Sequence, residues 1–193
     1  EIAAPFLRTA LFCLASLSTT QMAVAAADRS EQRLHYRNAM NAVERGPADA
    51  WKPYVADLGD YPLLPYLELA LLERGSAKPS RTQVQEFAKR WPESLVATTL
   101  VETTLRELAN AGDWPTFRAL WNDSQATDLR CAFQRSRIAA GEKPKYSPDI
   151  DTLWMQPRPA PSLCEPLFTW ARQNGELDDA EVWKRIEAAA IAA

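Results

Sequence analysis

The sequence contains few of the residues from which metal sites and histidine-based catalytic sites are built. Its 193 residues include one histidine, His35, and three widely spaced cysteines, Cys13, Cys131 and Cys164. These are too few soft ligands for a structural zinc site, and there is no second histidine for a proton relay. We therefore expect no metal site and no cofactor, and we interpret His35 as a surface histidine early in the first helix.

An excess of positive charge is also missing. The chain carries 22 Lys and Arg against 25 Asp and Glu, which gives a formal net charge of -3. Binding to a phosphate backbone requires clustered basic side chains that replace the counterions. The composition therefore argues against nucleic acid as a partner.

Strand patterns are scarce, because no stretch alternates apolar and polar residues for long. Valine and isoleucine are few beside alanine, leucine, glutamate and arginine, so the composition favours helices. The pattern predicts helices over residues 33–45, 48–58, 65–74, 80–90, 93–111, 114–121, 127–140, 161–174 and 178–190. The segment between 143 and 166 is rich in proline and is the least regular part of the chain.

Glycines follow the expected helices at nearly regular intervals. Five of the six glycines end a predicted helix, and the intervals between them are 29, 37, 29 and 34 residues, for Gly46, Gly75, Gly112, Gly141 and Gly175. This spacing is close to the ~34-residue period of helical-hairpin repeats. We therefore expect an all-α fold, a right-handed superhelix of stacked helix pairs of the TPR-like α-solenoid kind.

Long hydrophobic runs are absent, and a short apolar block lies near the start. Arg8 precedes the block Ala10–Leu17, and small residues follow up to Ala25. This order predicts a signal peptide over residues 1–25, because the block is far shorter than the ~20 residues of a membrane span. The remainder, 26–193, is expected to be one part of a helical domain. The start at Glu1 and the alanine-rich end suggest a fragment.

Removal of the leader would leave an even pair of cysteines, Cys131 and Cys164. Disulfides persist in the oxidising compartment to which an exported chain is delivered, so a bridge between the two is the favoured interpretation. The alternative is two unrelated buried thiols, since sequence alone does not give their separation in space.

Two features invite a functional interpretation but have simpler structural ones. Glu68 lies in a leucine-rich segment, where a raised pKa would suit a general acid; a structural carboxylate that accepts hydrogen bonds is the stronger interpretation. Trp114, Phe117 and Trp121 have the spacing of a buried helix face. Core packing is favoured for them over stacking on sugar rings.

Three stretches of the chain resemble a known family. They are LGDYPLLPYLELALLERG (58–75), FAKRWPESLVATTLVETTLRELANAGDWPTFRALW (87–121), and Cys131 and Cys164 ahead of FTWARQNG. Together they resemble the amino-terminal helical region of the soluble lytic murein transglycosylases, and the resemblance runs from about Glu31 to the end. Its most specific parts are the run from Asp60 to Glu68 and the Gly112-Asp113-Trp114 turn.

The resemblance implies a superhelical region that carries a separate lysozyme-like domain. In that domain a glutamate protonates the glycosidic oxygen and the muramic acid's own hydroxyl attacks, giving a 1,6-anhydro product. The family's catalytic Glu-Ser pair is followed by a Gly-Leu-Met-Gln stretch, which this sequence lacks. Glu93-Ser94 is the only Glu-Ser pair, so we assign no catalytic residue.

The sequence therefore leads to a non-catalytic scaffold region of a periplasmic peptidoglycan lytic transglycosylase. Its expected partner is the glycan strand, through the full-length enzyme, and we expect a monomer without a membrane span. The alternative is a free-standing periplasmic helical-repeat adaptor that holds a protein partner on its concave face. An enzyme complete within these residues has little support, because no acid–base or nucleophile–base constellation is recognisable.

Overall fold

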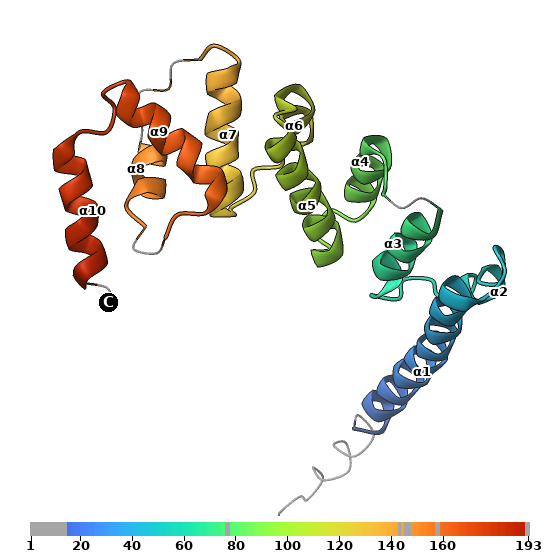
Figure 1. Ribbon diagram of the computed structural model, residues 1–193. Coiled ribbons are helices and arrows are strands. Elements are labelled where there is room, and N and C mark those ends of the chain that lie inside the picture. Colours follow the sequence, from blue (N-terminus) through green and yellow to red (C-terminus); the bar gives the residue numbers. More distant parts are fainter. Residues whose placement is uncertain (1–14, 76–77, 143, 145–147, 157–158, 192–193) are drawn as a thin grey trace, which may run out of the picture. The chain divides into compact units, whose positions relative to one another are not determined.

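The computed structural model describes residues 15–75, 78–142, 144, 148–156 and 159–191, with backbone alone for 15–28, 75 and 148. Within these ranges all regular secondary structure is helical, which confirms the predicted all-α class (Figure 1). The elements are α1 (Ala15–Arg45), α2 (Lys52–Val55), α3 (Leu64–Gly75), α4 (Arg81–Arg90), α5 (Leu95–Ala111), α6 (Trp114–Leu120), α7 (Thr127–Ala139), α8 (Pro148–Trp154), the 3₁₀ turn η1 (Ser162–Cys164), α9 (Glu165–Gln173) and α10 (Asp179–Ile191).

The chain forms two compact units, Glu1–Gln83 and Val84–Ala193. Residues 1–14 of the predicted signal peptide, 1–25, lie outside the described residues. From Ala15 to Ala25 the structure describes a helical backbone that is continuous with the rest of α1. The leader remains a prediction.

The core of the first unit forms where α1 packs against α2 and α3. Its buried members come from α1, from the turns before α3 and from α3 itself: Ala39, Val43, Leu58, Tyr61 and Leu67. The leucine-rich helix is less enclosed than its sequence suggests. Leu67 is fully buried, whereas Leu63 just ahead of the helix is 41% exposed and Leu64 and Leu71 are half-buried.

The end of α1 is held by a side chain from α3. The guanidinium of Arg74 donates hydrogen bonds to the carbonyl oxygens of Ala42, Gly46 and Pro47. These carbonyls lie at the helix end that carries partial negative charge, where a cation is stabilising. Gly46 is required by close packing, because a Cβ there would lie 2.8 Å from the Ala42 carbonyl oxygen and 2.9 Å from the Ala50 Cβ.

Part of the core of the second unit lies among α4, α5, α6 and α7. Its buried apolar residues are Val84, Val101, Leu105, Ala109, Phe117, Leu120, Leu129, Ala132 and Leu163. Phe117 is fully buried, and the rings of Trp114 and Trp121 lie 6.0 and 5.7 Å from it, between ring centroids. The core interpretation of this aromatic spacing agrees with the structure.

A second cluster joins α7 to α8, α9 and α10, and the disulfide lies within it. Cys131 in α7 and Cys164 at the end of η1 are fully buried and bonded to each other, with 4.9 Å between their Cα atoms. The favoured pairing of the two cysteines agrees with the structure. Trp154 packs edge-on against Phe168, and its indole nitrogen donates to the Glu181 carbonyl 3.1 Å away.

The structure corrects several predicted helix boundaries. The expected helix over 48–58 contains only the single turn α2, and α5 begins at Leu95, after Pro92 rather than around it. The proline-rich segment contains a helix, α8, which the sequence did not predict. The expected helix over 161–174 begins with the 3₁₀ turn η1.

Gly112 ends α5, as predicted, in the left-handed conformation with φ 71°. No helix within the described residues is long and apolar enough to cross a membrane.

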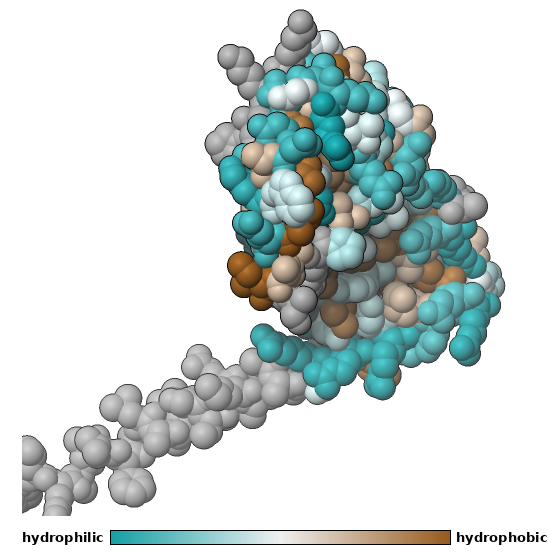
Figure 2. Space-filling model, turned by 60° about the vertical axis from the view of Figure 1, so that its left-hand side comes forward, coloured by the Kyte–Doolittle hydropathy of each residue, from teal (hydrophilic) through white to brown (hydrophobic). Residues whose placement is uncertain are grey.

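The face in Figure 2 is mixed in character, with hydrophobic areas among hydrophilic ones. Figure 2 turns α10 toward the viewer. On this helix Trp183 and Ile186 are 63% and 50% exposed.

Candidate functional site

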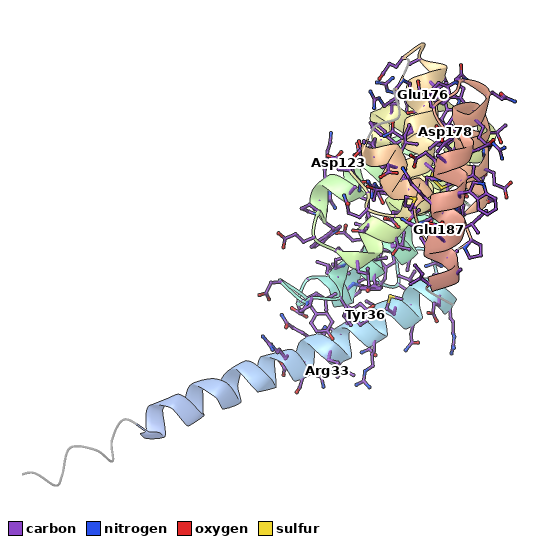
Figure 3. All side chains as sticks on the ribbon, turned by 90° about the vertical axis from the view of Figure 1, so that its left-hand side faces the viewer. Arg33, Tyr36, Asp123, Glu176, Asp178 and Glu187 are labelled. Carbon is purple, nitrogen blue, oxygen red and sulfur yellow. A yellow bond between two sulfur atoms is a disulfide. The ribbon has the colours of Figure 1, made fainter. Side chains whose placement is uncertain are left out.

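A shallow cavity of about 190 Å³ lies in the second unit, between α7, the loop that joins α6 to α7, and the start of α8. It is lined by Trp121, Asp123, Ser124, Gln125, Arg130, Phe133, Gln134 and Asp149. We call it the loop cavity. Figure 3 labels Asp123, which lies in the loop.

The loop that forms one side of this cavity is held by its own polar groups. Asp123 has φ 57°, a left-handed conformation that aspartate tolerates better than most residues. One of its carboxylate oxygens accepts a hydrogen bond from the Trp121 indole nitrogen at 3.1 Å, and its backbone carbonyl accepts from Gln125 Nε2 at 2.8 Å. The loop therefore keeps the Asp123 carboxylate at the cavity.

A polar network behind the loop ties it to α5 and α7. Ser124 Oγ donates to Glu102 Oε1 at 2.6 Å and accepts from the backbone nitrogen of Ala126 at 3.2 Å. Arg106 Nε donates to Asp128 Oδ2 at 2.6 Å, and its Nη2 lies 3.5 Å from Glu102 Oε2. The hydrogen bond to Asp128 is the main cause of a raised pKa at Arg106, which stays charged. This network fixes the position of the loop.

The opposite wall is one face of α7. Arg130, Phe133 and Gln134 lie at i, i+3 and i+4, so they line the same side of the helix. The Phe133 ring stacks on the Trp121 ring with 4.7 Å between centroids and an interplanar angle of 15°. The cavity therefore has an aromatic wall that connects the loop to the helix.

Gln134 and Arg130 bring hydrogen-bond donors to this wall. Gln134 is only 4% exposed, and its Oε1 accepts from Arg137 Nη1 at 3.1 Å. Within the described part of the chain, Gln134 Nε2 and the half-buried guanidinium of Arg130 have no hydrogen-bond or ion-pair partner. Both residues therefore have hydrogen-bond donors that are available to a further group at the cavity.

A second charged cluster lies at the other end of α7. Glu142 accepts from Arg137 Nε at 2.7 Å and lies 3.2 Å from Arg118 Nη2, so it connects α6 to the end of α7. The hydrogen bond from Arg137 is the largest cause that lowers the pKa of Glu142 below its ordinary value of 4.5.

The structure does not bring the sequence candidates together in one site. Glu68 lies half-buried on α3 in the first unit, where it has an interaction partner. Glu93 is exposed, and Ser94 occupies the residue before α5, so the Glu-Ser pair is the start of a helix. No three His, Cys, Asp or Glu side chains in the described part of the chain lie close enough to hold a metal ion.

His35 lies in the later part of α1 and not early in its helix, because α1 begins at Ala15, and it is half-buried among neighbours that the sequence did not predict. Its Nδ1 lies 3.3 Å from a carboxylate oxygen of Asp57, without the geometry of a hydrogen bond. Its ring packs edge-on against Tyr54, 6.3 Å away between centroids. The side chain is half-buried and helps to join α1 to the segment around α2.

The loop cavity itself was not found from sequence. The only local signal is the polar run from Asn122 to Gln125 between two apolar helices, which is typical of any surface loop. The loop meets Arg130 and Gln134 at the cavity because Asp123 has a positive φ and because α7 directs this face toward the loop. Neither feature can be predicted from the sequence.

Comparisons with known proteins show that this helical chain is similar to part of several lytic transglycosylases. It is 28% identical over 179 residues to the soluble lytic murein transglycosylase of Escherichia coli K12, and 26% identical over 160 residues to that of Salmonella typhimurium LT2. These alignments cover 92% and 82% of this chain. No family model matches the chain.

Solved structures agree with this relationship. An inactive mutant of the lytic transglycosylase Slt from Pseudomonas aeruginosa matches 82% of this chain with a TM-score of 0.67 and 29% sequence identity. The complex of the 70-kDa soluble lytic transglycosylase with bulgecin A matches 83% of it with a TM-score of 0.68 and 26% identity. In each case the match covers 26% of the solved chain.

The chain is thus homologous to part of the soluble lytic murein transglycosylases, which confirms the resemblance seen in its sequence. It spans about a quarter of the length of the curated relatives that it matches, 27% for the Escherichia coli enzyme.

Proposed function

We propose that residues 26–193 are the amino-terminal part of a non-catalytic, superhelical scaffold in a periplasmic peptidoglycan lytic transglycosylase. The whole enzyme would cleave the bond between MurNAc and GlcNAc and leave a 1,6-anhydro product. The catalytic glutamate would belong to a domain outside these residues, and the signal peptide 1–25 would direct export. The scaffold would hold that domain and shape the space around the glycan strand.

One observation carries this proposal. The relationship to the transglycosylases extends over 92% of this chain but over only 27% of the relative. A non-catalytic role also agrees with the sequence, because the only Glu-Ser pair, Glu93-Ser94, is not followed by the family's Gly-Leu-Met-Gln stretch.

A chimeric enzyme tests the scaffold role. Residues 26–193 would replace the aligned segment of the Escherichia coli transglycosylase, and purified cell-wall sacculi would be the substrate. We expect this chimera to release anhydromuropeptides, measured by mass spectrometry, at a rate well above that of an enzyme from which the segment is deleted.

A second chimera that carries an unrelated helical-repeat segment of equal length is the control, and it should behave like the deletion. A deletion enzyme as active as the intact one would contradict the scaffold role. That result would favour the alternative of a free-standing helical-repeat adaptor.

A further inference from the structure

The loop cavity combines unpaired donors with unpaired acceptors. The donors are the Arg130 guanidinium and the Gln134 amide nitrogen, which have no partner among the described residues. The acceptors are the second carboxylate oxygen of Asp123 and the carboxylate of Asp149, which also have no partner among the described residues. The four residues that carry these groups line the same small cavity.

This distribution of charge favours a neutral ligand over an ion. A free carboxylate would meet Asp123 and Asp149, and an ammonium group would meet Arg130. A hydroxyl group donates and accepts at the same time, so a ligand with several hydroxyls can satisfy both sets.

The aromatic wall and the volume limit the ligand further. Trp121 and Phe133 give the cavity an apolar surface beside its polar groups, the mixture that is typical of small-molecule sites. At about 190 Å³, the cavity is smaller than the ~300 Å³ at which pockets for drug-sized ligands begin. It therefore suits one ring rather than a long chain.

We propose that the loop cavity binds one ring of a neutral saccharide, with its hydroxyls on Arg130, Gln134 and Asp123 and its C–H face against Phe133. The loop is held in advance by the Ser124–Glu102 hydrogen bond, so little ordering is needed on binding. This site is distinct from a catalytic site, and it does not depend on the scaffold role proposed above.

Nuclear magnetic resonance on the full 193-residue chain tests this proposal with N,N′-diacetylchitobiose as the probe. The Trp121 indole N–H and the Gln134 side-chain amide give signals within the cavity itself. We expect saturable shifts of both signals at millimolar sugar, and none with sodium acetate at the same concentration.

Two variants separate the cavity from the rest of the surface. Arg130→Met removes a charged donor and keeps the length of the side chain, so we expect at least about tenfold weaker binding. Asp123→Asn keeps a residue that tolerates positive φ and should weaken binding too. The matched control is Arg172→Met on α9, an exposed arginine outside the cavity, which should bind like the parent.

Circular dichroism melts establish whether each variant is folded. If Arg130→Met does not fold, Asp123→Asn provides the test in its place. Three results would overturn the proposal: no saturable shift of the two cavity signals, equal shifts with acetate, or equal affinity in the Arg130→Met and Arg172→Met proteins. The scaffold role would be unaffected by any of them, because it is tested on the chimeric enzyme.

Discussion

At the residue scale, Arg106 makes polar contacts with two acidic side chains in the second unit. It donates to both carboxylate oxygens of Asp128, at 2.6 and 3.3 Å, and approaches Glu102. Its side chain is 37% exposed, so water screens part of each interaction. Arg106 still neutralises the half-buried carboxylates of Asp128 and Glu102. Without it, only water would compensate their charge.

We expect Arg106→Met to lower the free energy of unfolding by about 1–2 kcal/mol, because it leaves Asp128 and Glu102 without their cation. Urea unfolding measures the change, and the exposed Arg172→Met is again the control. A loss no larger than that of the control would show that the network contributes nothing to stability.

Glu142 predicts a pH dependence. Its pKa is lower in the folded protein than its ordinary value of 4.5, mainly through the hydrogen bond from Arg137. The ionised form is therefore favoured by folding, and this stabilisation is complete above pH 4.5 and is lost as the pH falls through the lowered pKa.

The stability difference between the parent and Glu142→Gln should thus be constant near neutral pH and shrink in acid. Urea unfolding of both proteins from pH 7 to pH 3 provides the measurement. A difference that grows as the pH falls would contradict the role given to this carboxylate.

Among individual residues, the sequence identified those whose role depends on type and spacing. The disulfide pair and the buried Phe117 belong to this group. A pair of cysteines behind a predicted signal peptide favours a disulfide, and an i, i+3, i+7 aromatic spacing favours a buried helix face. Gln134 and Asp123 could not be identified, since their roles depend on an open amide and a positive φ that exist only in the folded chain.

At the scale of elements, helices bounded by glycine were predicted well. α5 and α7 end where Gly112 and Gly141 take positive φ, a conformation that glycine adopts without strain. α8 was missed because it has only seven residues and lies in a proline-rich segment. Its apolar residues Ile150, Leu153 and Trp154 are buried by the cluster around the disulfide, so tertiary packing rather than local propensity stabilises it.

The disulfide should be a major stabilising link between elements, because it joins α7 to the η1–α9 segment across 33 residues. A loop of this length corresponds to about 3–4 kcal/mol in the chain-entropy treatment. Thermal melts with and without reductant should differ by several degrees, and the Cys131→Ser and Cys164→Ser proteins should resemble the reduced form. Two free thiols in the native, unreduced protein would contradict the bridge.

At the scale of the whole molecule, the glycine period predicted the all-α class, and the resemblance predicted the similarity to the lytic transglycosylases. The division into the units Glu1–Gln83 and Val84–Ala193 was not predicted, because the repeat pattern continues across residue 83 and gives no signal of a boundary. The proposed scaffold role belongs to the whole chain. It does not depend on any one group of side chains, because glycan cleavage would take place in another domain.

The most direct test of that role is to incubate the purified chain with cell-wall sacculi and to analyse the soluble products by mass spectrometry. The Escherichia coli transglycosylase provides the positive control and heat-inactivated chain the background. The account predicts no anhydromuropeptides above background from this chain. Anhydro products that are abolished by Glu68→Gln or Glu93→Gln would contradict it and would show that these residues contain an active site of their own.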